Sequence, residues 1–169
     1  MRDTSSARRK TAASALAVLA CTIGLTLGGT SQAQAAGSYD GKDPQSTGCS
    51  NNSTTLSSAP LKTSAGDRIG TIEMRYSPSC LTQWIRVYSQ VTNCSGQPCG
   101  NGAKIHRTAS TSDGGTGWYG RSPSSASGQP YQWSLMVHTP NTRACGTGYA
   151  DTGVNLAYPN GSAGSQICG

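Results

Sequence analysis

The sequence predicts an all-β protein: a single disulfide-stapled β-sandwich or partly open barrel with long Gly/Ser-rich loops. Several short stretches alternate apolar and polar residues, which is the period of a half-buried strand. No segment after the first 35 residues keeps a helical apolar period of 3.6 residues over three turns. Turns rich in glycine and proline separate the stretches at short intervals, as is typical of sandwiches and barrels.

Residues 1–35 predict a cleavable secretory signal. An apolar run rich in alanine and leucine extends from Thr11 to about Gly29 and ends near Ala33-Gln34-Ala35, which has small residues where a signal peptidase cleaves. The basic residues before the run are Arg2, Arg8, Arg9 and Lys10. We expect cleavage after Ala35, which leaves residues 36–169 as one secreted β-rich domain.

Two variants of this signal remain open. Arg8-Arg9 is a feature of the twin-arginine route, but the next residues are Lys-Thr-Ala and not a bulky apolar pair. Val18-Leu19-Ala20-Cys21 partly matches a lipoprotein box, but the residues after Cys21 stay apolar. We therefore expect Cys21 to leave with the signal and the secreted domain to have no membrane segment.

The charge distribution argues against a nucleic-acid partner. The chain has 13 Lys and Arg against 7 Asp and Glu, a net charge of +6. The first 35 residues hold four of the basic residues and one acidic residue, so residues 36–169 carry nine against six, or +3. These nine are scattered, whereas a nucleic-acid surface needs clustered Lys and Arg.

Six cysteines in residues 36–169 predict a disulfide framework in an oxidising compartment. Only 34% of the chain is hydrophobic and Phe is absent, so cross-links of about 2–4 kcal/mol each would supplement a thin core. Six cysteines allow fifteen pairings, and proximity favours Cys94 with Cys99 and Cys145 with Cys168, which leaves Cys49 with Cys80. Structural zinc sites repeat a C-x(2–4)-C unit, whereas only one such unit, Cys94 to Cys99, occurs here, so we expect no metal and no cofactor.

The strands follow in order along the chain. Residues 36 to about 60 predict irregular structure held by Cys49, because Gly, Ser, Asn and Thr dominate. The stretches 69–76 and 83–91 predict a hairpin closed by a Ser-Pro-Ser-Cys turn. Loops rich in serine and glycine are expected at 110–117 and 122–128. The remaining expected strands are 103–109, 117–121, 131–138, 143–150 and 154–158.

The most regular alternation lies at residues 131–138, where we expect one half-buried strand. Two sets of residues alternate in this stretch. The first set is Tyr131, Trp133, Leu135 and Val137, and the second is Gln132, Ser134, Met136 and His138.

Three stretches together carry a family resemblance: Tyr39-Asp-Gly-Lys-Asp-Pro44 with Thr47-Gly-Cys49, Gly70 through Glu73-Met-Arg-Tyr-Ser-Pro-Ser-Cys80, and Trp84-Ile-Arg-Val87. Their order resembles the YjfA-like secreted domain of Gram-positive bacteria, a family of unknown function. The resemblance covers about residues 39–90 and implies that Cys49 and Cys80 belong to a shared core. It implies no activity and no catalytic residues.

The strongest candidate binding residues are Trp118, Tyr119 and Arg121. Aromatic rings beside an arginine in a Gly-rich setting predict a stacking platform for sugars or a hot spot for a protein partner. The alternative is a short core strand with its aromatic rings inward, because a chain without Phe must pack its core with Trp and Tyr.

Other residue patterns point more weakly to chemistry, and we assign no catalytic residue. Residues 40–43 predict a turn in preference to a calcium loop. Glu73 is expected to pair with Arg75 or Arg86 on one strand face. Glycosidases use paired carboxylates, and triads use a histidine. The candidates for those roles are Asp40, Asp43, Asp67, Glu73, Asp113, Asp151, His106 and His138.

These features favour a non-enzymatic extracellular or cell-envelope binding or structural domain that meets a cell-wall glycan or another secreted protein. A secreted hydrolase of glycosidase type is the first alternative. A protease inhibitor is the second, because the short Cys94–Cys99 loop would hold a rigid backbone. The sequence does not set the oligomeric state.

Overall fold

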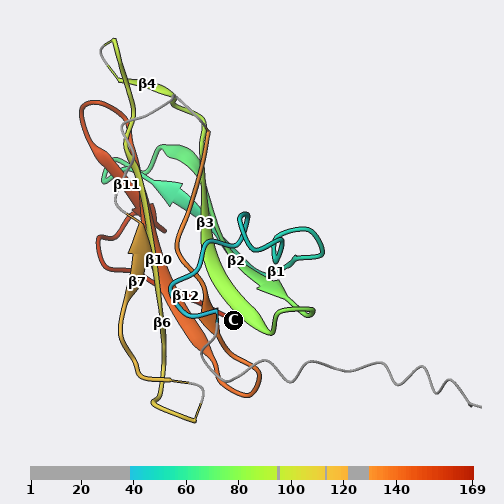
Figure 1. Ribbon diagram of the computed structural model, residues 1–169. Coiled ribbons are helices and arrows are strands. Elements are labelled where there is room, and N and C mark those ends of the chain that lie inside the picture. The colour runs from blue at the N-terminus through green and yellow to red at the C-terminus, as the bar shows by residue number, and fades with distance from the viewer. Residues whose placement is uncertain (1–38, 95, 113, 122–129) are drawn as a thin grey trace, which may run out of the picture. The chain divides into compact units, whose positions relative to one another are not determined.

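The computed structural model describes residues 39–94, 96–112, 114–121 and 130–169, which belong to one compact unit. These residues form strands and no α-helix, so the all-β prediction is confirmed (Figure 1). The predicted signal with Cys21, Asp113 and the 122–128 loop lie outside the described residues. The strands are β1 (Thr54–Lys62), β2 (Arg68–Ser77), β3 (Thr82–Ser89), β4 (Asn93–Cys94), β5 (Gln97–Pro98), β6 (Asn101–Arg107), β7 (Tyr119–Arg121), β8 (Tyr131–Trp133), β9 (Val137–His138), β10 (Ala144–Asp151), β11 (Leu156–Pro159) and β12 (Ile167–Cys168).

A single antiparallel sheet contains ten of these strands, in the order β7-β6-β10-β11-β1-β2-β3-β8, with β9 and β12 pairing β3 and β10. The sheet curls into a half-barrel whose edge strands, β7 and β8, do not pair with each other. This is the partly open barrel that the sequence predicts. The β4–β5 hairpin forms a separate two-stranded sheet that extends at one end (Figure 1).

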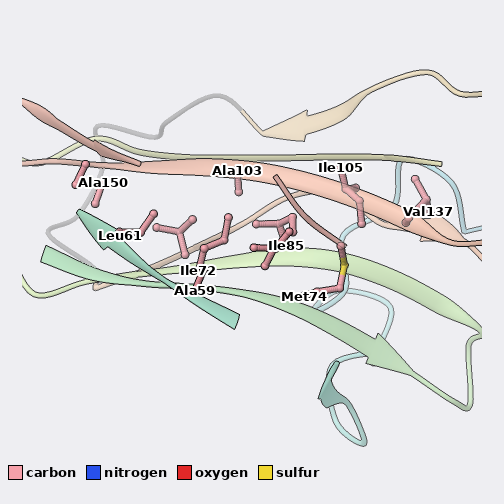
Figure 2. Close-up of a cluster of buried hydrophobic side chains, with 13 residues drawn as sticks. Ala59, Leu61, Ile72, Met74, Ile85, Ala103, Ile105, Val137 and Ala150 are labelled. Carbon is pink, nitrogen blue, oxygen red and sulfur yellow. The ribbon is translucent and has the colours of Figure 1, made fainter. Parts of the chain in front are cut away.

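The main core lies inside this curl. Figure 2 shows apolar side chains of β1, β2 and β3 pointing toward those of β6 and β10. Several side chains on the β6 and β10 side are small, such as Ala103 and Ala150, although Ile105 also comes from β6. Larger ones such as Leu61, Ile72 and Ile85 come from the facing strands. The core therefore stays thin, as a chain without Phe requires.

Two glycines of β10 let the layers approach closely. A Cβ on Gly146 would lie 2.3 Å from Ile85 Cγ1 and 2.7 Å from the Lys104 carbonyl oxygen. A Cβ on Gly148 would lie 2.6 Å from Val87 Cγ2. Since protein interiors are packed to crystal-like density, these positions have no room for a side chain.

Three disulfides are present, and they are the pairs that proximity along the chain favours: Cys49–Cys80, Cys94–Cys99 and Cys145–Cys168. Cys49 and Cys80 pack with Trp84 and Met136 in a second, smaller buried cluster. The N-terminal loop, residues 39–53, is thus held against the outer face of β3.

The structure corrects two predicted elements. Residues 36 to about 60 are not irregular throughout, because β1 pairs along its length with β2 in spite of its Ser and Thr content. The strand predicted at 131–138 is broken into β8 and β9, with Ser134 donating its N–H to the Ile85 carbonyl between them. Its buried residues are Gln132, Ser134, Met136, Val137 and His138, while Tyr131 is exposed. Strands β4, β5 and β12 were not predicted, since each has only two residues.

A buried ion pair joins five segments at one end of the sheet. The side chain of Arg107 is fully buried and its Nη2 pairs with Asp40 Oδ1. Arg107 Nε donates to the His138 carbonyl (2.8 Å), and Nη1 donates to the Gly115 carbonyl (3.0 Å). Asp40 also accepts from the His138 N–H (2.7 Å) and from the Tyr119 hydroxyl (3.4 Å). The N-terminal loop, β6, β7, β9 and the loop before β7 therefore meet at one charge pair.

We predict that Gly146→Ala destabilises the protein by about 1–3 kcal/mol, because the added methyl must displace Ile85 and the Lys104 carbonyl. Gly117→Ala is the matched control, since a methyl there meets no atom within 4 Å. Chemical denaturation of both variants measures the difference in free energy of unfolding. Equal stability would contradict the close packing of the two layers.

We predict that Asp40→Asn lowers the free energy of unfolding by about 3–5 kcal/mol, because it leaves the buried Arg107 guanidinium without a countercharge. The exposed Asp67 supplies the control, and Asp67→Asn should change stability by no more than about 0.5 kcal/mol. A similar small change in both variants, measured by urea denaturation, would show that the ion pair is dispensable.

Candidate functional site

A groove of about 570 Å³ lies on the outer face of the sheet, over β7, β6, β10 and the segment after β11. The register places Gly120, Lys104 and Thr147 side by side across three strands. Gly102 and Tyr149 form the next row. The lining residues are Gly102, Ala103, Lys104, Gly120, Thr147, Gly148, Tyr149, Tyr158, Ala163 and Gly164.

The Tyr149 ring lies across a glycine. A Cβ on Gly102 would be 2.3 Å from Tyr149 Cε1 and 2.7 Å from Cζ, so the ring occupies the space above the β6 backbone. Tyr158 stands beside it, with 6.3 Å between the ring centroids. The glycine thus allows the tyrosine to lie low on the sheet and to wall the groove with an aromatic ring.

Trp118 stands next to the groove and is 46% exposed. Its ring packs against the His106 ring, with 4.1 Å between centroids, and Lys104 Nζ lies 4.5 Å from the Trp118 centroid. A cation over an aromatic face is attracted by the ring quadrupole. The indole is therefore held in place by two side chains of β6 while much of its surface stays open to solvent.

Of the other two predicted binding residues, Tyr119 does not join Trp118 at this surface. Tyr119 is half-buried, packs against the main core and bonds to Asp40, so it points inward. Arg121 ends β7 opposite Ala103, and its side chain lies outside the described residues. Successive residues of a strand face opposite sides of the sheet, which separates Trp118 from Tyr119.

Lys104 is the one charged residue among the described residues that line the groove. The pKa of the Tyr149 phenol is raised above its ordinary value of 10.0, chiefly by burial and also by the negative charges of Asp151 and Tyr158. Tyr149 is therefore neutral at physiological pH and offers a hydroxyl that can donate and accept.

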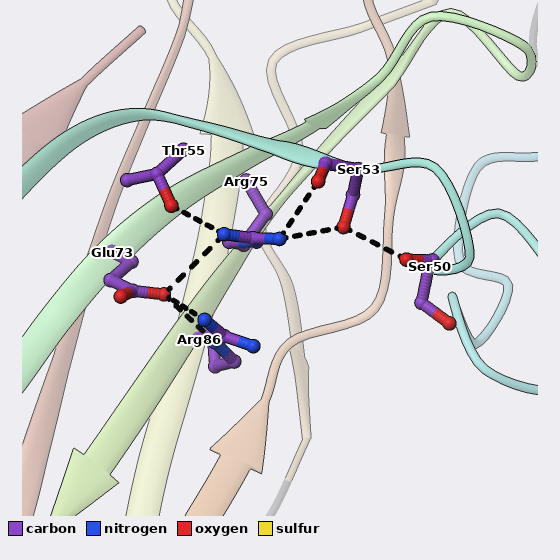
Figure 3. Close-up of polar contacts among 6 residues, drawn as sticks. All are labelled: Ser50, Ser53, Thr55, Glu73, Arg75 and Arg86. Carbon is purple, nitrogen blue, oxygen red and sulfur yellow. Dashed lines mark hydrogen bonds and ion pairs between the residues drawn. The ribbon is translucent and has the colours of Figure 1, made fainter.

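A smaller hollow of about 90 Å³ lies on the outer face of β2 and β3, beneath the N-terminal loop. Figure 3 shows Arg75 between Ser53 and Thr55, with Glu73 beside both Arg75 and Arg86. Arg86 Nε donates to Glu73 Oε2 (2.8 Å), while Glu73 lies 3.8 Å from Arg75 Nη1. Glu73 therefore pairs with both arginines, as the sequence predicts.

Arg75 acts chiefly as a tie between the loop and the sheet. Its Nη2 donates to the Ser53 carbonyl (3.0 Å) and hydroxyl (2.8 Å), and its Nη1 donates to the Thr55 hydroxyl. Burial and then the nearby charge of Arg86 lower the pKa of Arg75, and Glu73 opposes this shift. The guanidinium is thus already occupied by protein oxygens.

The remaining candidates for chemistry are dispersed. Residues 39–41 form a turn in which the Lys42 N–H donates to the Tyr39 carbonyl (3.0 Å), and Asp43 Oδ1 accepts the N–H of Gln45 (2.7 Å). His106 lies on the outer face beside Trp118, while His138 is buried at the Asp40 ion pair. No group of three or more His, Cys, Asp or Glu residues able to hold a metal occurs within the described part of the chain. None of the segments described there is a helix long and apolar enough to cross a membrane.

Comparison with known proteins gives the chain a family. The family profile described as "Protein of unknown function (DUF2690)" matches residues 37–147, well over half of the chain, so the protein belongs to this family. The match includes Lys104 and Trp118 and ends before Tyr149 and Tyr158. No curated protein and no solved structure gave a significant match.

Sequence analysis missed most of the groove, namely Gly102, Lys104, Thr147, Tyr149 and Tyr158. One signal was present in Gly146-Thr-Gly-Tyr149, where glycine occupies every second position of a strand. A strand whose inward positions are glycine presents its larger side chains outward only. The partners on β6 and β11 carry no such signal.

We predict that Tyr149 makes the protein less stable at alkaline pH. Because its pKa is raised on folding, the unfolded chain loses this proton first, and stability falls as the pH rises above 10.0. Tyr149→Phe should remove part of that fall and leave stability at neutral pH nearly unchanged. Denaturation at several pH values measures both, and identical alkaline profiles would contradict the shift.

Proposed function

We propose that the protein is a secreted, non-enzymatic domain that binds a glycan of the cell envelope in the groove over β6 and β10. The single observation that carries this proposal is the aromatic wall of a glycine-lined hollow, where Tyr149 lies on Gly102 with Tyr158 beside it. Trp118 adds an exposed ring on the other side of Lys104. The C–H bonds on the flat face of a sugar carry partial positive charge and pack on the negative face of an aromatic ring.

The polar groups of the groove suit the same ligand. Thr147, Tyr149 and Tyr158 supply hydroxyls that can both donate and accept hydrogen bonds, as sugar hydroxyls require. A largely apolar hollow with a few converging polar groups is the usual form of a small-molecule site. A protein partner remains the alternative occupant, because exposed Trp and Tyr are also common in interface hot spots.

The alternative functions have weaker support. A glycosidase of the usual kind needs two carboxylates at the scissile bond, and no carboxylate among the described residues lines the groove. An inhibitor would present the Cys94–Cys99 hairpin, which extends from the sheet with Asn93 and Gly96 exposed. Neither of the two hollows described above includes a described residue of the hairpin, so the groove remains our preferred site.

We also propose that the protein acts outside the cytoplasm and that it is related to a family of secreted domains. The three disulfides indicate an extracellular or other oxidising environment. The basic and apolar pattern of residues 1–35 supports export with cleavage after Ala35. Within the family of unknown function, we propose a relationship to the YjfA-like secreted domain of Gram-positive bacteria, on the residues quoted above.

We predict that the oxidised protein sediments with purified cell walls and binds soluble wall oligosaccharides, and that Tyr149→Ala weakens this binding roughly tenfold or more by removing a stacking ring. Gly102→Ala should weaken it as well, because the methyl lifts the ring from the sheet. Tyr131→Ala removes an exposed aromatic ring of β8 that does not line the groove, and it serves as the control.

Isothermal titration and sedimentation measure the affinity, and thermal unfolding reports whether each variant is folded. Binding that survives both groove variants would place the ligand elsewhere. Absence of any glycan binding by the wild type would overturn the proposal.

A further inference from the structure

Lys104 is an exposed cation at the wall of the groove. It points outward from β6 between Gly120 and Thr147, and Gly120 has no side chain to shield it. No ion pair joins Lys104 to any carboxylate in the described ranges. The ammonium group instead rests 4.5 Å from the centre of the Trp118 ring.

The contact with Trp118 limits the positions that the Lys104 ammonium group can take. A solvent-exposed lysine usually samples many rotamers, and fixing it costs side-chain entropy. Contact with Trp118, which also packs against His106, favours conformations that keep the ammonium beside the aromatic wall. A ligand that stacks in the groove would therefore meet a positive charge at a defined place.

The second positively charged hollow lacks this free charge. Arg75 already donates to Ser53 and Thr55, and Arg86 is engaged by Glu73. An anion there would compete with protein oxygens, whereas an anion in the groove would meet an ammonium whose three donors have no oxygen partner within the described structure.

We infer that the groove recognises an anionic glycan, one whose sugar or polyol units carry carboxylate or phosphate groups, with Lys104 as the residue that binds the negative charge. This inference rests on the proposed glycan-binding function. Hydrogen bonds between charged partners are shorter and stronger than neutral ones, so one such contact separates acidic from neutral ligands. The net charge of +3 on residues 36–169 adds a weak general attraction of the same sign.

The test compares three polymers with the folded, oxidised protein: polygalacturonate for carboxylates, a glycerol-phosphate polymer for phosphates, and a neutral N-acetylglucosamine oligosaccharide. Affinities are measured by isothermal titration at low and at moderate salt. The variants are Lys104→Met, Lys104→Arg as the rescue, and Lys42→Met, which removes an exposed lysine of the N-terminal loop. Tyr149→Ala reports on the stacking wall.

We expect the wild type to bind at least one acidic polymer more tightly than the neutral one, with affinity that falls as salt rises. Lys104→Met should lower the acidic affinity roughly tenfold, about the worth of one charged hydrogen bond, and leave neutral binding unchanged. Lys104→Arg should restore most of it, and Lys42→Met should have no effect. Whichever acidic polymer binds identifies carboxylate or phosphate as the source of the charge.

The other outcomes separate this inference from the proposed function. Equal binding of acidic and neutral polymers that Tyr149→Ala weakens and Lys104→Met does not would keep the glycan groove and overturn the anionic preference. An equal loss in Lys104→Met and Lys42→Met would assign the attraction to net charge and would also overturn it. Failure to bind all three polymers, with the folded state confirmed, would overturn both.

Discussion

The buried pair of Arg107 and Asp40 is the constraint on which the architecture depends. A fully buried guanidinium is tolerable only when it has a countercharge and hydrogen-bond acceptors. Arg107 obtains these from the N-terminal loop, β9 and the loop before β7. Because the groove lies over β7, β6 and β10, the position of its β7 wall follows from the contacts that the ion pair imposes on Tyr119 and its neighbours.

Glycine has opposite uses on the two faces of the same strands. Toward the core, Gly146 and Gly148 admit Ile85 and Val87, so the layers close with little apolar mass. Toward solvent, Gly102 admits the Tyr149 ring and Gly120 leaves Lys104 uncovered. The composition that makes the core thin therefore also shapes the hollow, while the disulfides restrict the unfolded chain and offset the small core.

Local sequence patterns were sufficient to predict most strands, but they were insufficient to predict which side chains each strand buries. The alternation at 69–76 and 83–91 predicted the β2–β3 hairpin because those strands bury one apolar face. The β1 strand was missed, since pairing with β2 and not its Ser-rich sequence makes it a strand. At 131–138 the alternation was present, but main-chain bonds to the Asp40 loop, such as Met136 N–H to the Lys42 carbonyl, redirect the chain.

By itself the sequence determined the fold class and, through proximity, favoured the three cysteine pairs that the structure holds. The alternation of apolar and polar residues showed which residues of a strand lie on the same face of the sheet. It did not show which other strand lies beside that strand. The tertiary structure alone brought Lys104, Trp118, Tyr149 and Tyr158 to one surface, and turned Tyr119 away from Trp118 toward Asp40. The reason is that pairings between distant strands depend on how the whole sheet curls and packs, which no short segment encodes.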